Sequence, residues 1–104
     1  MADAKDAMLD LLDERVFDPA IDADQGKYPT EKRRELAGVQ KTARETKASY
    51  HKYGSAEHIK SMFQDDLRSP YGQRQTRELH DLGLPGLPDV KNDFMSLAEK
   101  YHVR

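Results

Sequence analysis

Residues 18–31, DPAIDADQGKYPTE, contain four carboxylates and one glycine. They lie between two segments whose apolar residues have helical spacing, as the loop of a calcium-binding EF-hand does. Such a loop requires oxygen ligands at positions 1, 3 and 5, glycine at position 6 and glutamate at position 12. With Gly26 at position 6, position 12 is Lys32, and with Asp22 at position 1 it is Arg33. The spacing therefore disfavours calcium, which stays a lesser alternative to a solvated acidic loop, and we assign no metal ligand.

The four histidines also lack the spacing of a metal site. His51, His58, His80 and His102 include no pair four residues apart, the spacing that binds zinc from one helix face. Glu99 and His102 form one Glu-x-x-His element, whereas di-iron bundles use this element twice and add glutamates from two further helices. The sequence contains no cysteine, so thiolate sites and disulfides are excluded.

Candidate catalytic groups are limited to pairs of acids on charged helical segments. Asp65 with Asp66 and Glu78 with Asp81 could serve acid–base chemistry, but such pairs are typical of a solvated surface. There is no Gly-x-Ser-x-Gly nucleophile motif and no glycine-rich phosphate loop with its lysine. We therefore predict a protein that is not an enzyme, with no catalytic residues, no cofactor and no evident small-molecule substrate.

The basic segment 30–53 is the strongest remaining candidate for a site. Three of its cations fall within about 20° of one another on a helical projection, opposite its apolar stripe. The stripe consists of Leu36, Val39, Ala43 and Tyr50. Two tyrosines near its end could stack on bases or anchor a protein interface. The residues predicted to contact a partner are Arg34, Lys41, Lys52, Tyr50 and Tyr53.

The charge distribution leaves two interpretations of this segment open. Residues 1–26 carry eight acids and two bases, and residues 27–54 carry eight bases and three acids. The split indicates either an interaction surface or two neighbouring helices that neutralise each other. A nucleic-acid partner is the alternative to a protein, but the isoelectric point of about 6.1 and the acids Glu31, Glu35 and Glu45 on the same segment disfavour it.

The elements that must position these residues are predicted to be helices. Apolar residues recur at helical spacing, and no window alternates as a strand does. We predict an all-α fold, a small bundle of four or five helices in a single domain over residues 1–104, with irregular loops at about 18–29 and 83–88. Helices are expected at 3–17, 30–53, 55–68, 73–82 and 89–102, of which the second, third and fifth have predicted N-caps at Thr30, Ser55 and Asp89.

Tyr71 and the run LGLPGLP at 82–88 could form an exposed hydrophobic edge. Each proline of the run forces the preceding residue into an extended conformation, and the glycines permit turns, so a rigid connector is expected. Ordinary turn packing explains the same residues equally well, and the sequence alone does not separate the two.

The composition also bears on the expected location of the protein. Charged residues make up 35% of the chain, and no apolar run is long enough to span a membrane. Together with the absence of cysteine, this favours a cytoplasmic protein with no membrane partner. The function predicted is a protein–protein interaction or regulatory module that uses segment 30–53 to bind a protein partner or to self-associate.

Overall fold

The computed structural model describes residues 3–104, and every regular element within them is helical. No strand is present between residues 3 and 104, so the predicted all-α fold is confirmed. The helices are α1 (Ala4–Leu12), the π-helix η1 (Asp13–Phe17), α2 (Asp18–Ile21), the 3₁₀ turn η2 (Gln25–Lys27), α3 (Thr30–Lys52), α4 (Ala56–Arg68), α5 (Pro70–Asp81), the 3₁₀ turn η3 (Leu87–Val90) and α6 (Lys91–Lys100).

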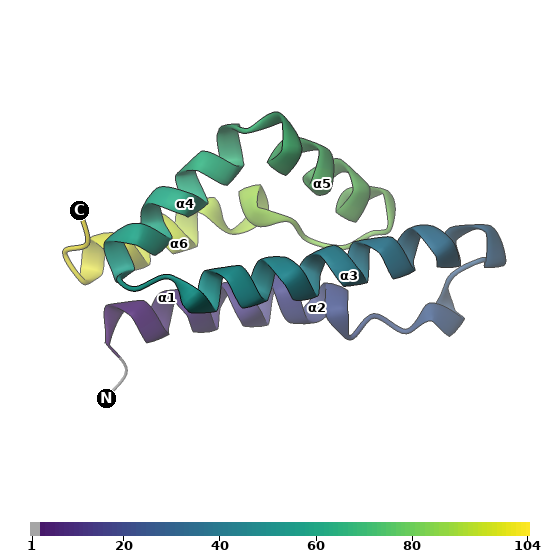
Figure 1. Ribbon diagram of the computed structural model, residues 1–104, viewed down its shortest axis with the longest axis horizontal. Coiled ribbons are helices and arrows are strands. Elements are labelled where there is room, and N and C mark those ends of the chain that lie inside the picture. The colour runs from purple at the N-terminus through teal and green to yellow at the C-terminus, as the bar shows by residue number, and fades with distance from the viewer. Residues whose placement is uncertain (1–2) are drawn as a thin grey trace.

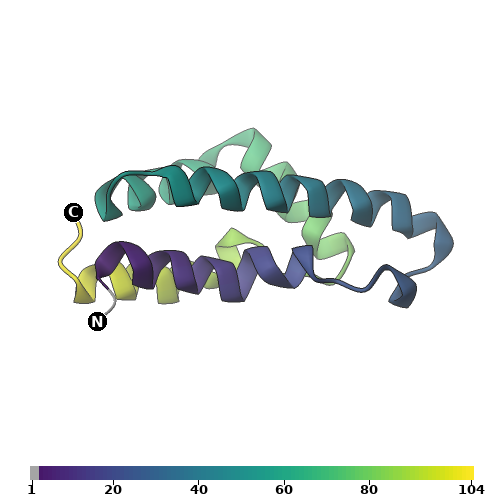
Figure 2. The same cartoon turned by 60° about the horizontal axis from the view of Figure 1, so that its bottom comes forward.

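Two long rods lie side by side and run antiparallel, as Figures 1 and 2 show. The first rod is α1, η1 and α2 in sequence, and the second is α3. Helices α4 and α5 form a bent pair above α3, and α6 packs against α1 (Figure 1). None of the helices described over residues 3–104 has both the length and the apolar character needed to cross a bilayer.

The first rod extends past Pro19 because a π-helical turn precedes it. In a regular α-helix the ring of an interior proline clashes with the carbonyl group four residues earlier. In η1 the hydrogen bonds reach five residues back, as from Asp18 N to Asp13 O, and this wider turn accommodates the proline. Residues 18–21 are therefore helical, and the predicted loop at 18–29 is wrong for this part.

Two of the three predicted helix caps need correction. Ser55 Oγ accepts a hydrogen bond from His58 N at 3.1 Å, as predicted. Thr30 is the first residue of α3, whereas Pro29 occupies the cap position without a side-chain hydrogen bond. Asp89 Oδ2 accepts from Gly86 N at 2.7 Å, so Asp89 caps η3 instead of α6. The helix boundaries were thus predictable to within a few residues, whereas only one of the three predicted capping groups is confirmed.

The corner between α4 and α5 is built by Ser69, Pro70 and Gly72. Ser69 ends α4, and its Oγ accepts from Gly72 N at 2.9 Å to cap α5. Pro70 takes the first helical position, where a missing N–H leaves no bond unmade. Helix α5 therefore begins at Pro70, whereas the sequence predicted a turn there and a helix from residue 73. A Cβ atom on Gly72 would lie 1.9 Å from Asp66 O, so only glycine fits where the two helix backbones touch.

The predicted loop at 83–88 is irregular up to Gly86. Gly83 has φ +72°, a left-handed conformation that ends α5, and Leu84 N donates to Leu79 O at 2.9 Å. The chain then enters η3 at Leu87 and returns toward α1.

The buried apolar residues form two separate clusters. The larger one joins α1, η1, α4 and α6 to the end of α3, with Phe63 and Phe94 stacked at its centre, 3.9 Å between ring centroids. The smaller cluster contains Ala20, Leu36, Val39, Ala43 and Leu82. The predicted apolar stripe of α3 is buried, but its residues are divided between the two clusters.

We expect Gly72→Ala to destabilise the fold by about 1–3 kcal/mol, because the new methyl group must push α4 and α5 apart at their closest approach. Urea unfolding followed by far-UV circular dichroism measures this change.

Gly38→Ala is the matched control, since a Cβ there meets nothing within 4 Å on the exposed side of α3. It should stabilise the protein by roughly 0.5–1 kcal/mol through the better helix propensity of alanine. Equal effects of the two substitutions would contradict a tight contact at the corner.

Candidate functional site

The outward face of α3 carries the predicted cations. Arg34, Lys41 and Lys52 are all exposed, and none of the five ion pairs found within residues 3–104 includes them. We call these three residues the cation row. Two acids, Glu35 and Glu45, are also exposed on α3, so the surface around the row has mixed charge.

Two residues of α3, Lys47 and His51, contact acids of the first rod. Lys47 Nζ lies 2.6 Å from Asp18 Oδ1, and His51 Nε2 lies 2.8 Å from Asp13 Oδ2. The hydrogen bond to Asp18 raises the pKa of Lys47 above its ordinary value. The interpretation that neighbouring helices balance the charge split is therefore confirmed for the Lys47–Asp18 pair, and it does not extend to the cation row.

Tyr50 was wrongly predicted to contact a partner. Its side chain is 1% exposed, and its ring packs against Phe17 and Tyr53 with centroids 5.5 and 5.2 Å away. Its hydroxyl donates to Asp66 Oδ2 at 2.5 Å, and burial is the main cause of its raised pKa. Helical projection placed Tyr50 on the apolar stripe, and its burial agrees with that position. Tyr53 is half-buried and stacks on His58 at 4.4 Å.

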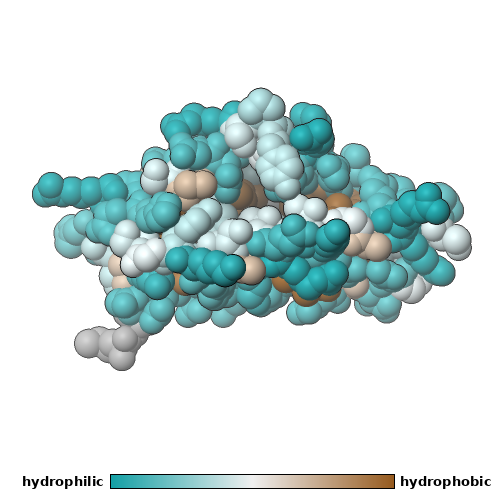
Figure 3. All heavy atoms as spheres, viewed as in Figure 1, coloured by the Kyte–Doolittle hydropathy of each residue, from teal (hydrophilic) through white to brown (hydrophobic). Residues whose placement is uncertain are grey.

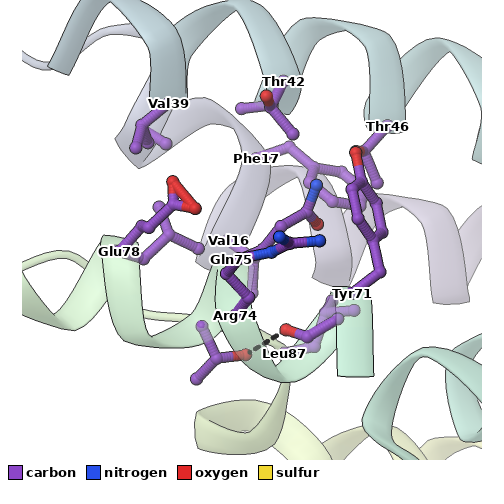
Figure 4. A pocket seen from close by; sticks show the side chains of 15 residues that line it. Val16, Phe17, Val39, Thr42, Thr46, Tyr71, Arg74, Gln75, Glu78 and Leu87 are labelled. Atoms are coloured by element: carbon purple, nitrogen blue, oxygen red, sulfur yellow. Dashed lines mark hydrogen bonds between the residues drawn. The ribbon is translucent and has the colours of Figure 1, made fainter. Parts of the chain in front are cut away.

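A cavity of about 250 Å³ lies between α3 and α5, where the two core clusters separate. Figure 4 shows side chains from α3, η1 and α5 converging on it, and Figure 3 shows apolar atoms at the bottom of a hollow in a polar surface. We call it the apolar compartment. Its apolar lining residues are Val16, Phe17, Ala20, Val39, Ala43, Leu79 and Leu87.

Helix α5 also contributes Tyr71, Arg74, Gln75, Thr76 and Glu78 to the lining of the apolar compartment. Tyr71 stands at the cavity and is 58% exposed, more than any other large apolar side chain in the described part of the chain. Arg74 places its guanidinium carbon 5.8 Å from the centre of the Tyr71 ring. Gln75 Nε2 is buried and has no hydrogen-bond partner among residues 3–104. A buried donor without a partner is unfavourable, so this amide is available to an occupant of the cavity.

A second cavity of about 240 Å³ adjoins the first and shares Thr46, Tyr71 and Gln75 with it. We call it the acidic compartment, because two carboxylates and several hydroxyl groups line it. Its lining residues are Glu45, Thr46, Ser49, Tyr50, Tyr53, Asp66, Tyr71 and Gln75.

Asp66 is a half-buried carboxylate that no cation neutralises within residues 3–104. Burial raises its pKa, and the hydrogen bond from the Tyr50 hydroxyl opposes this rise only in part. The acidic compartment is therefore a region of negative potential beside aromatic rings.

The acidic loop of residues 18–31 shows no cation-binding geometry. Asp18 bonds to Lys47, and Asp24 Oδ1 accepts from Gly26 N at 2.8 Å. Across residues 3–104, histidine, aspartate and glutamate side chains nowhere gather in a group of three that could hold a metal ion.

Neither compartment was predicted from the sequence, although Tyr71 was expected as a possible exposed residue. One signal was present: Thr42, Ala43 and Thr46 are small residues on the inner side of α3, where larger ones would fill the space. That signal becomes meaningful only when the position of α5 is known.

No family model, no curated protein and no solved structure matches this chain. Its function must therefore be inferred from its own geometry.

The free energy of unfolding of Asp66→Asn, relative to the unmutated protein, should rise as pH rises from below 4 toward neutrality. A carboxyl group with a raised folded-state pKa contributes most stability when protonated, and this contribution is lost as pH rises through that pKa. Urea unfolding at a series of pH values measures the difference. Asp10→Asn, which removes an exposed carboxylate of α1, controls for the loss of one charge; the same pH trend in both variants would contradict the assignment.

Gln75→Met should leave stability unchanged or raise it by up to about 1–2 kcal/mol, because it removes a buried unpaired donor and keeps the chain length. Thermal and urea unfolding measure this, with Gln73→Met on the exposed side of α5 as the control. A loss of more than about 1 kcal/mol at Gln75 alone would mean that solvent inside the cavity satisfies this amide.

Proposed function

We propose that this protein is a non-enzymatic binding module that docks an acidic region of a partner protein on the outward face of α3. The observation that supports this most directly is the cation row, whose three side chains are exposed and unpaired within residues 3–104. At 1.5 Å per residue, its members are about 10 and 16 Å apart along the helix, which suits several contacts with one protein surface. Tyr53 follows Lys52 at the end of the row and is partly exposed.

Mixed charge favours a protein over a nucleic acid as the partner. Glu45 follows Lys41 by one helical turn, and Glu31 and Glu35 are exposed near Arg34. A phosphate backbone would be repelled by these acids, whereas a protein surface can place its own cations opposite them. A cytoplasmic location, which the lack of cysteine fits, is part of this proposal.

Reversing two charges of the row, by Arg34→Glu with Lys41→Glu, should weaken partner binding on the order of tenfold at low salt. The immobilised full chain captures partners from an extract of the source cells, and quantitative mass spectrometry compares the variant with the unmutated protein. The affinity of each captured protein is then measured at two salt concentrations.

Lys91→Glu with Arg104→Glu is the matched control, because it makes the same change of charge at exposed residues outside α3. Partners that both double variants retain equally would refute the assignment of the cation row. Light scattering reports whether the partner is a second copy of this chain. Steeply salt-dependent binding of random duplex DNA that only the α3 reversal removes would identify a nucleic-acid partner and overturn the proposal.

A further inference from the structure

The two compartments between α3 and α5 offer one ligand two different environments. The apolar compartment is larger than the roughly 150 Å³ that accepts a benzene molecule in an apolar protein cavity. The acidic compartment lies next to it and shares Thr46, Tyr71 and Gln75 with it, so a ligand with two chemically distinct ends can contact both. None of the three residues of the cation row lines either compartment, so this inference does not depend on the function proposed for the row, although Glu45 follows Lys41 by one helical turn.

The acidic compartment is suited to a protonated amine. Glu45 and Asp66 provide two carboxylates that pair with no cation elsewhere in residues 3–104. The Tyr53 and Tyr71 rings can attract a cation through their π faces, and Thr46 and Ser49 add hydroxyl acceptors. An anion would meet Glu45, Asp66 and Glu78 and would find one cation, Arg74, at the border of the site.

The junction of the compartments favours an aromatic ring next to the amine. Gln75 Nε2, which lacks a partner, can donate to the face of an aromatic ring as well as to an oxygen atom. Phe17 and Tyr71 line the same cavity and provide aromatic contacts for such a ring. A polyamine without an apolar body would leave the apolar compartment empty.

We infer that the cavity between α3 and α5 binds a small arylalkylamine, with its ring among Phe17, Val39 and Ala43 and its ammonium group beside Glu45 and Asp66. Arg74 competes with the ammonium group for the face of Tyr71, 5.8 Å from its own guanidinium carbon, and moves aside when the site is occupied.

Three probes of similar size separate charge from shape: 2-phenylethylamine, 2-phenylethanol and 3-phenylpropionate. Titration of the full chain, followed by calorimetry and by amide chemical shifts, should give the amine a dissociation constant of about 1 mM or tighter. The alcohol should bind about 10- to 100-fold more weakly, the difference expected for a charged hydrogen bond, and the carboxylate should not bind. Equal binding of amine and alcohol, or preference for the carboxylate, would overturn the inference.

Variants locate the two ends of the ligand. Asp66→Asn with Glu45→Gln should reduce affinity for the amine to that for the alcohol and leave the alcohol unaffected. Ala43→Leu should abolish binding of both, because its side chain fills the apolar compartment. If that variant fails to fold, Thr42→Leu at a half-buried position of the lining provides the same test, with Ala48→Leu on the exposed side of α3 as control. Unchanged amine binding in a folded filled variant would refute the site.

A lysine side chain of a partner protein presents the same ammonium group on an apolar stem. N-acetyl-lysine methylamide is therefore titrated in parallel, and tighter binding of this probe than of 2-phenylethylamine would overturn the arylalkylamine assignment. Arg34→Glu alone should leave amine binding unchanged, because Arg34 lies roughly 16 Å along α3 from Glu45, so a failure of one proposal can be told apart from a failure of the other.

Discussion

The contact between the Gly72 backbone and the Asp66 carbonyl oxygen controls the shape of this protein. It brings α4 and α5 together at a sharp corner, so α5 descends toward α3 without packing along it. The side chain of Asp66 then receives the Tyr50 hydroxyl from α3, which ties all three helices at one residue. The space left between α3 and α5 forms the two compartments. The corner and the cavities therefore both follow from the contact between Gly72 and Asp66.

The π-helical turn shapes the opposite wall. By carrying the first rod past Pro19, it keeps Val16, Phe17 and Ala20 on the side that faces α3 and α5. The cavity, the unpaired Gln75 amide and the half-buried Asp66 carboxylate each lower stability. Unfavourable features gathered at one place, in a chain whose helices are otherwise consistent with their sequence, are typical of a binding site.

The charged residues of α3 point in two directions. On the side that faces the first rod, Lys47 pairs with Asp18 and His51 bonds to Asp13. On the outward side, Arg34, Lys41 and Lys52 have no such pair within residues 3–104. Exposed ion pairs contribute only about 0–1 kcal/mol each, so the outward charges add little to the stability of the fold.

The sequence by itself determined the all-α class, the approximate extent of five helical segments and the exposure of Arg34, Lys41 and Lys52, because apolar spacing at the helical period reports which face is buried. It also predicted the exposure of Tyr71 as one of two possibilities. The sequence did not show that residues 18–21 continue a helix, and tertiary structure alone decided that Glu45, Asp66 and Gln75 share a cavity. This cavity depends on the angle between α4 and α5. Such contacts join residues far apart in the chain, and no local pattern encodes them.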